Sequence, residues 1–245
     1  MILLLLMSCE ALESFEFLLY EVRQPVTEVS YAGSVLASTF DFETPFTGGT
    51  MTWLDMDGAE LAVGEEPDPT NNPGYWTAVL PPETEFVLRV DGGEGYYPAV
   101  ARGLSPAGNG LWFTGALFGW PAELTDPYFV DTALQLGVTL EPLVDGQVAY
   151  LWGAVHPDSI DVFEGGRLTV IDGDGEEAPV SAWIVDESGV FVPTDVPPAD
   201  YFLAYNLAPG DVTVLYDGDD DTIETLYPDV QGGDVVTPWF YYVAP

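Results

Sequence analysis

Short runs of β-branched and aromatic residues, bounded by Gly, Pro, Asp or Asn, recur along most of this 245-residue chain. In several runs apolar and polar residues alternate, as they do in a strand with one buried face. This pattern predicts an all-β fold. The expected strands are residues 34–40, 50–54, 75–80, 85–90, 110–118, 148–155, 167–171, 180–185, 190–192, 201–206, 211–216, 223–226 and 235–243.

One strand–turn–strand pattern occurs twice, at 75–88 and at 201–216, and its anchors Leu80 and Leu207 are 127 residues apart. A Trp-Phe pair and an Asp-x-Asp-Gly segment also recur in the same order. The distance between the copies differs from one matching segment to the next, and an extra hairpin at 182–192 in the second copy accounts for this difference. Because ordered self-similarity indicates repeated units, we interpret the chain as two tandem antiparallel β-sandwich domains, residues 28–120 and 148–245.

Residues 121–147 connect the two copies. Asp126 and Pro127 are typical of a helix start, with Asp as N-cap and Pro as first helical residue, and Gly137 is typical of a helix end. Apolar residues between them form a stripe with helical spacing. We therefore expect a short connecting helix, followed by a linker.

The second copy resembles a carboxypeptidase regulatory-like domain, a small transthyretin-like β-sandwich. In that family an aromatic residue and a short strand precede Leu-Pro-Pro-Gly and an alternating strand. The residues that fit this pattern are Phe202, Leu207, Pro209, Gly210, Val212 and Val214. Ala208 replaces the first Pro, and Glu83 stands at the Gly position of the first copy. The resemblance implies transthyretin- or immunoglobulin-like sandwiches that serve as scaffold, adhesion or carbohydrate-binding modules, and it carries over no catalytic residue.

The charge narrows the range of partners. The chain has 41 acidic residues against four Arg and no Lys, a formal net charge of −37. Such a surface repels nucleic acid and disfavours anionic membranes. The lack of Lys excludes Schiff-base and phosphate-loop chemistry, and a single His, His156, argues against a zinc site. The explanations of the acidity that stay open are cation binding, and adaptation to high salt or a lineage-wide bias in amino-acid usage.

The first nine residues, Met-Ile-Leu-Leu-Leu-Leu-Met-Ser-Cys, are apolar but shorter than the about 20 residues that span a bilayer. They indicate the end of a secretory signal. Residues 6–9 resemble a bacterial lipobox, which implies a lipid on Cys9. Residues 10–27 then form a tether or a short strand, and the protein lies in the cell envelope, on the outer membrane, in the periplasm or at the surface. The alternative is a buried or free Cys in a cytosolic protein.

Three functions follow from these features. The leading one is a non-enzymatic, lipid-anchored binding or scaffold protein whose partner, protein or glycan, is unknown. The second is carbohydrate binding through exposed aromatic residues, the alternative being that these residues form the core. The candidates are Trp76, Tyr97, Trp112 and Trp120. The third is a glycoside hydrolase with paired carboxylates, which the scarcity of basic residues and the small domains disfavour.

No cofactor is expected except a calcium ion. If successive strands of the second copy alternate in direction, the loops after residues 171, 192 and 216 lie at the same end. There they bring together ten carboxylates. Calcium prefers six to eight oxygen ligands, which Asp-x-Asp loops supply. The candidate ligands are Asp172, Asp174, Glu176, Asp217, Asp219 and Asp221. The alternative is a set of ordinary Asp-Gly turns on an acidic surface.

Calcium that binds only the native state should raise the midpoint of thermal unfolding. The measurement compares millimolar calcium with chelator at fixed ionic strength. A rise no larger than the one given by matched sodium would show screening of charge and no site.

Overall fold

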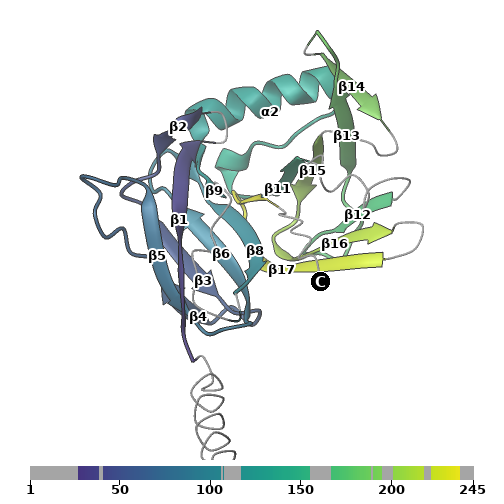
Figure 1. Cartoon of the computed structure of the whole chain (residues 1–245). Coiled ribbons are helices and arrows are strands. Elements are labelled where there is room, and N and C mark those ends of the chain that lie inside the picture. Colours follow the sequence, from purple (N-terminus) through teal and green to yellow (C-terminus); the bar gives the residue numbers. More distant parts are fainter. Residues whose placement is uncertain are drawn as a thin grey trace, which may run out of the picture.

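The computed structural model describes residues 27–38, 41–105, 107, 117–154, 167–188, 190–194, 201–217 and 222–237 (Figure 1). These residues are mostly β-strands, which confirms the all-β class. One α-helix, α2 (Ala122–Leu136), and one 3-10 helix, η1 (Leu143–Asp145), lie among them. Within the same residues, no helix combines the length and the apolar character needed to cross a membrane.

The strands of the first half are β1 (Val29–Ser38), β2 (Asp41–Pro45), β3 (Thr50–Leu54), β4 (Glu60–Val63), β5 (Tyr75–Leu80), β6 (Glu85–Asp91), β7 (Tyr96–Tyr97), β8 (Ala99–Leu104), β9 (Leu117–Phe118) and β10 (Trp120–Pro121). Those of the second half are β11 (Ala149–Ala154), β12 (Arg167–Ile171), β13 (Val180–Val185), β14 (Phe191–Thr194), β15 (Tyr201–Leu207), β16 (Gly210–Asp217), β17 (Thr222–Val230) and β18 (Val235–Val236).

Corresponding strands of the two copies pair in the same way. β1 is antiparallel to β5, as β11 is to β15. The order β3-β6-β8 in the first copy matches β12-β16-β17 in the second, again antiparallel. The short strands β9 and β18 run parallel to β1 and β11 respectively. The repeat in the sequence is therefore also a repeat of strand pairing.

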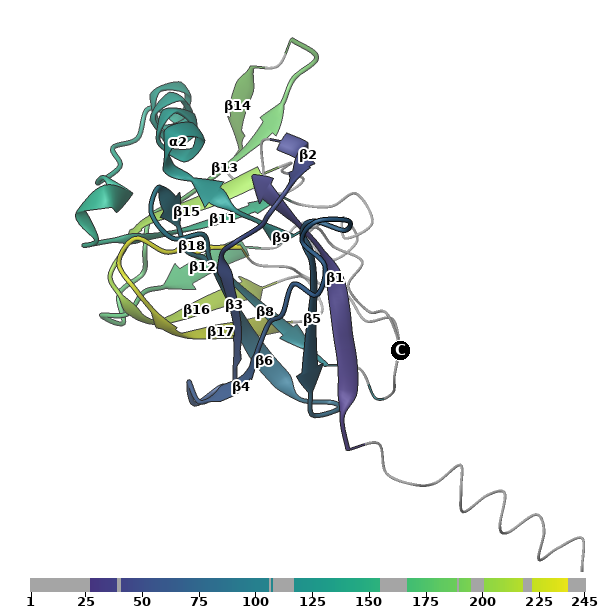
Figure 2. The ribbon, with the colours of Figure 1, turned by 90° about the vertical axis from the view of Figure 1, so that its left-hand side faces the viewer.

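The two copies share one sheet. β18 pairs in parallel with β8 of the first copy as well as with β11, which produces the nine-stranded order β14-β13-β15-β11-β18-β8-β6-β3-β4. The N–H of Val235 donates to the carbonyl of Pro98 at 2.9 Å, and that of Thr237 donates to Val100 at 2.8 Å. In Figure 2 the strands of both copies accordingly form one continuous body. No local pattern in the sequence indicates this junction.

Two buried apolar clusters hold the sheets together, and both draw residues from the two copies. Phe202 and Leu207, 2% and 0% exposed, lie in the smaller cluster, as expected of the strand before the Pro-Gly turn. Val87 and Val100 of the first copy pack in the same cluster. The junction between the copies is therefore apolar as well as hydrogen-bonded.

The connecting helix exists, but the predicted start was wrong. α2 begins at Ala122, after Pro121 in an extended conformation, so Pro127 lies inside the helix. The Asp126 carboxylate does not cap the helix; it accepts a hydrogen bond from the Tyr97 hydroxyl at 2.7 Å. The predicted end is confirmed, because Gly137 adopts the left-handed conformation, φ 69°, after the last helical residue.

Five strands, β2, β4, β7, β8 and β10, are absent from the sequence prediction. Four others, β3, β5, β12 and β13, have the predicted bounds. The expected strands at 110–118 and 235–243 are described only at residues 117–118 and 235–237, and their remaining residues lie outside the described ranges.

Leu207 should be an anchor of this core. Leu207→Ala is expected to lower the free energy of unfolding by roughly 2–5 kcal/mol, because it removes fully buried methyl groups and leaves a cavity. Urea denaturation measures this cost. Leu104→Ala is the matched control, since Leu104 is 53% exposed and should change stability by less than about 0.5 kcal/mol. A cost below about 1 kcal/mol for Leu207→Ala would contradict the placement of this strand in the core.

Candidate functional site

The aromatic residues considered for sugar binding lie in the core wherever the structure describes them. Trp76, Tyr97 and Trp120 are 5%, 7% and 0% exposed, and Trp112 lies outside the described residues. The Trp76 indole N–H donates to the Phe46 carbonyl at 3.2 Å, and the Trp120 ring stacks on Phe129. These three rings offer no open face to a sugar, as the core alternative requires.

The Tyr97 hydroxyl is committed to structure. It lies between β7 and α2 and donates its hydrogen bond to Asp126. Burial raises the pKa of Tyr97, and the bond and negative charge of Asp126 raise it further. The phenol therefore stays protonated and does not act as a general base near neutral pH.

The candidate calcium ligands are only partly described. Asp174, Glu176 and Asp217 are exposed, whereas Asp219 and Asp221 lie outside the described residues. In the part of the chain that the structure describes, no group of three or more His, Cys, Asp or Glu side chains could hold a metal ion. The calcium site thus stays a prediction.

Asp172 uses its carboxylate to build a turn. One oxygen accepts the backbone N–H groups of Asp174 and Glu176, each at 3.1 Å, and the other accepts the N–H of Ala208 at 3.2 Å. Asp55, at the equivalent position of the first copy, accepts the N–H groups of Asp57 and Ala59 at 2.9 and 2.8 Å. The repeated Asp-x-Asp-Gly segment is therefore a hairpin turn in both copies.

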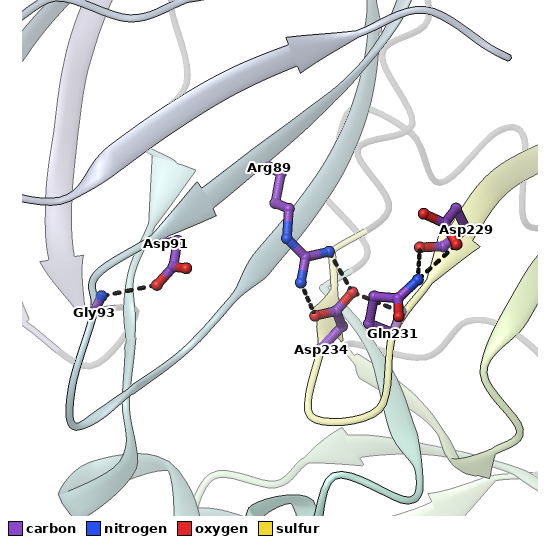
Figure 3. Close-up of polar contacts among 6 residues, drawn as sticks. All are labelled: Arg89, Asp91, Gly93, Asp229, Gln231 and Asp234. Atoms are coloured by element: carbon purple, nitrogen blue, oxygen red, sulfur yellow. Dashed lines mark hydrogen bonds and ion pairs between the residues drawn. The ribbon is translucent and has the colours of Figure 1, made fainter. Parts of the chain in front are cut away.

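The best-defined polar site of the described chain joins the two copies. The Arg89 guanidinium on β6 makes two parallel hydrogen bonds, each 2.7 Å, to the carboxylate of Asp234, which directly precedes β18 (Figure 3). The Asp234 side chain is fully buried, and the Arg89 side chain is 29% exposed. Such a bidentate pair has a fixed geometry and is among the stronger hydrogen-bonded contacts in proteins.

Burial raises the pKa of Asp234, although the hydrogen bonds and charge of Arg89 and the N–H of Gln231 oppose this rise. A raised carboxyl pKa often marks a catalytic acid. Here the carboxylate is inaccessible, and Arg89 and Gln231 occupy both of its oxygens. The arrangement therefore fixes structure and does not offer a proton to a substrate.

The turn that carries Asp234 is held from both sides. The Gln231 side-chain amide donates to the carboxylate of Asp229 at 2.6 Å and to its carbonyl at 3.0 Å (Figure 3). The N–H of Gly233 donates to the Val148 carbonyl at 2.8 Å. A Cβ atom at Gly232 would lie 2.0 Å from a backbone oxygen of the connector, so only glycine fits this close approach.

A second arginine of the first copy also reaches the second. Arg102 on β8 donates to the carbonyl of Leu226 on β17 at 3.1 Å and to the Glu85 carboxylate at 2.9 Å. We call the β8–β18 pairing, together with Arg89, Arg102 and Asp234, the seam. Sequence reasoning missed the seam because Arg89 and Asp234 are 145 residues apart and belong to no local motif. Only the scarcity of basic residues could have drawn attention to these arginines.

Comparisons with known proteins add little. No known family and no curated protein matches the sequence. Two solved structures share some resemblance, the Bacillus anthracis TIE protein (10% identity, TM-score 0.31, 86% of this chain covered) and bovine butyrophilin (9% identity, TM-score 0.18, 83% covered). The chain spans 33% of the first protein and 99% of the second. At these TM-scores, neither carries an argument about fold or function.

Removal of the Arg89 side chain should lower the free energy of unfolding considerably. Arg89→Met keeps most of the apolar stem but leaves Asp234 buried without its cation, which is expected to cost roughly 3–5 kcal/mol at pH 7. Asp234→Asn should cost less, because the partly exposed guanidinium can turn toward solvent. Chemical denaturation measures both, and the double variant should recover part of the loss.

The cost of Arg89→Met should depend on pH in a defined direction. Without Arg89, the pKa of Asp234 in the folded state rises further above its unfolded value, so the folded protein takes up a proton first. Stability is then lost as pH rises through the folded pKa, and the deficit should shrink from pH 7 toward pH 5. Arg167→Met, which breaks only the exposed pair with Glu177, is the control and should cost below about 1 kcal/mol. Equal losses in the two variants would contradict a structural role for the seam.

Proposed function

We propose that the protein is a non-enzymatic binding or scaffold protein of the cell envelope, anchored through a lipid on Cys9. Its body would be two carboxypeptidase regulatory-like β-sandwiches fused into one unit. The observation that supports this most is the seam. Domains of one chain move relative to each other unless their interface is large and apolar, and here a shared sheet, a shared core and a buried ion pair oppose such motion.

A rigid double unit suits a protein that holds other molecules at a fixed place. Function in β-sandwiches resides in what the rigid framework displays. The polar groups with the most unusual surroundings, Asp234 and Tyr97, are buried and hydrogen-bonded to other residues of the chain. They therefore argue for a framework over a catalyst. The same burial of Trp76 and Trp120 removes support from the sugar-binding alternative.

The proposed location in the cell envelope rests on the first nine residues and on the net charge of the chain. An apolar run that ends in Ser8-Cys9 fits lipid attachment, and residues 10–27 would give the body some distance from the bilayer. The strong negative charge would keep the body away from anionic lipid, so the lipid chains would provide the attachment. Binding would then occur on the displayed surface of the body.

Lipid attachment can be tested directly. Expressed in a bacterial host behind a complete secretory signal, the protein should partition into detergent and carry the mass of a diacyl or triacyl group on Cys9. Cys9→Ser should release it into the aqueous phase with an unchanged unfolding midpoint. Detergent partition and intact mass measure these outcomes. An unmodified wild-type protein in the aqueous phase would disprove the anchor.

A further inference from the structure

Large apolar side chains are exposed mainly on two elements that the repeat does not explain. Eleven such residues are exposed in the described part of the chain, and seven of them lie on α2 or on the β13–β14 hairpin. These seven are Leu124, Val130, Leu134, Ile184, Val185, Val190 and Val192. α2 belongs to the connector, and the end of the hairpin is the insertion of the second copy. Single exposed apolar residues are normal, but their concentration on neighbouring elements marks an interaction surface.

The hairpin is fixed against the C-terminal part of α2. The Phe191 N–H on β14 donates to the side-chain carbonyl of Gln135 at 3.2 Å. Trp183 on β13 is fully buried and stacks on Phe191 and Tyr201, with ring centroids 5.3 and 5.8 Å apart. Figures 1 and 2 both show the hairpin beside one end of α2.

The outer face of α2 carries large apolar side chains beside its charged ones. Thr125, Phe129 and Thr132 point into the protein and are buried. Val130 and Leu134, four residues apart on one face, are 61% and 76% exposed. Tyr128, Phe129 and Leu136 already provide the apolar stripe by which the helix packs on the core. The exposed pair therefore has no role in the packing of this chain.

Exposed apolar residues of both elements are neighbours, in sequence or in strand register, of the two residues of the Gln135–Phe191 contact. Leu134 precedes Gln135, Val190 precedes Phe191, and Val185 is the register partner of Phe191. The exposed fractions of Val185 and Val190 are 37% and 52%. We call Val130, Leu134, Val185 and Val190 the apolar ridge.

The charge around the apolar ridge indicates which kind of partner would bind there. Glu123 and Asp131 on α2 and Asp186 and Glu187 at the hairpin turn are exposed. The sequence has no Lys or Arg between Arg102 and Arg167 or after Arg167, so both elements lack basic residues. A second copy of the chain would bring like charge to the contact, which opposes self-association. A partner with Lys and Arg beside its apolar face complements both properties.

We propose that the apolar ridge is a docking surface for a cationic amphipathic helix of a partner protein. The spacing of Val130 and Leu134 forms a ridge that packs into the grooves of another helix. Addition of a strand to the edge strand β14 is less suitable, because Pro193 within it has no N–H to donate. This inference names the partner class for the proposed scaffold role, but it does not require the lipid on Cys9.

The probe is a fluorescein-labelled synthetic helix of about 18 residues, five turns, with Leu on one face and Lys elsewhere. Its scrambled isomer has the same composition and charge but no apolar face. The full chain carrying Cys9→Ser is titrated against both by fluorescence anisotropy at about 0.15 M salt, where surface charges are substantially screened. We expect micromolar binding of the amphipathic peptide and at least tenfold weaker binding of the isomer.

Leu134→Asp and Val130→Asp should each weaken the amphipathic peptide at least about tenfold. Each adds a negative charge, which alone would attract the peptide, so weakening must come from the lost apolar contact. Val79→Asp is the matched control: Val79 is 55% exposed on β5, and the same charge there should leave binding unchanged. The unfolding midpoint of every variant should stay close to that of the parent, because the side chains are exposed.

Equal binding of the two peptides would mean attraction by charge alone and would overturn the proposal, as would no binding or equal weakening by Val79→Asp. Sedimentation that shows a dimer, lost in Leu134→Asp, would assign the ridge to a second copy and overturn the cationic partner. Loss of detergent partition with retained peptide binding would overturn only the lipid anchor. Retained partition without peptide binding would overturn only the docking surface.

Discussion

The parallel pairing of β18 with β8 is the contact on which the arrangement of the two copies depends. It joins the β11–β15 sheet of the second copy to the β8-β6-β3 sheet of the first. These two sheets do not correspond to each other in the repeat. Charge opposes this contact, because residues 28–120 carry 13 acidic residues and two arginines, and residues 148–245 carry 19 and one. Bodies of like charge repel each other unless local contacts offset the repulsion. Both arginines of the first copy lie at the seam, where a positive charge reduces repulsion most.

The ion pair at the seam contributes specificity more than net stability. A buried pair often stabilises no better than apolar residues of the same volume, because both charges lose their hydration. A two-residue strand such as β18 has, however, little of its own to fix its register against β8. The carboxylate of Asp234 meets Arg89 only when Val235 lies opposite Ala99. Any slipped register would bury Asp234 without a partner, so the pair penalises the alternatives.

The sequence was sufficient wherever a strand is specified by its own residues. The segments 50–54, 75–80, 167–171 and 180–185 were predicted with the bounds that the structure shows, and the turn between β15 and β16 was found from its Pro-Gly pair. β8 was missed because its first three residues are all buried, so it has no alternation. Gly103 further weakens its strand pattern, although the close ring of Phe86 requires a small residue there. The pairings with β6 and β18 make this segment a strand, and neither is visible locally.

Local sequence signals also gave a wrong helix start where the expected N-cap residue takes part in a tertiary contact instead. Asp126 and Pro127 have the composition of a helix start, but the hydroxyl of Tyr97 donates a hydrogen bond to the Asp126 carboxylate, and α2 begins at Ala122, five residues before the predicted first helical residue. The seam shows a second reason for failure, because Arg89 and Asp234, 145 residues apart, are neighbours only where β18 pairs with β8. Sequence reasoning thus found many of the strands and turns, and it missed the contacts that place one copy against the other.

The acidic residues themselves divide by role. Asp55, Asp172 and Asp186 each accept two backbone N–H groups within their own turn. Hydrogen bonds from the side chain and backbone of Asn71 likewise hold the pKa of Asp68 below its usual value. Carboxylates of this kind are turn-forming groups, and backbone dipoles offset part of their charge without a cation. The acidic turns thus recur with the repeated units, whereas most of the exposed large apolar side chains lie on α2 and the inserted hairpin, outside the repeat. The exposed faces of these two elements take no part in the packing of the core, so their side chains can change without damage to the fold, which makes them a suitable place for contacts with other molecules.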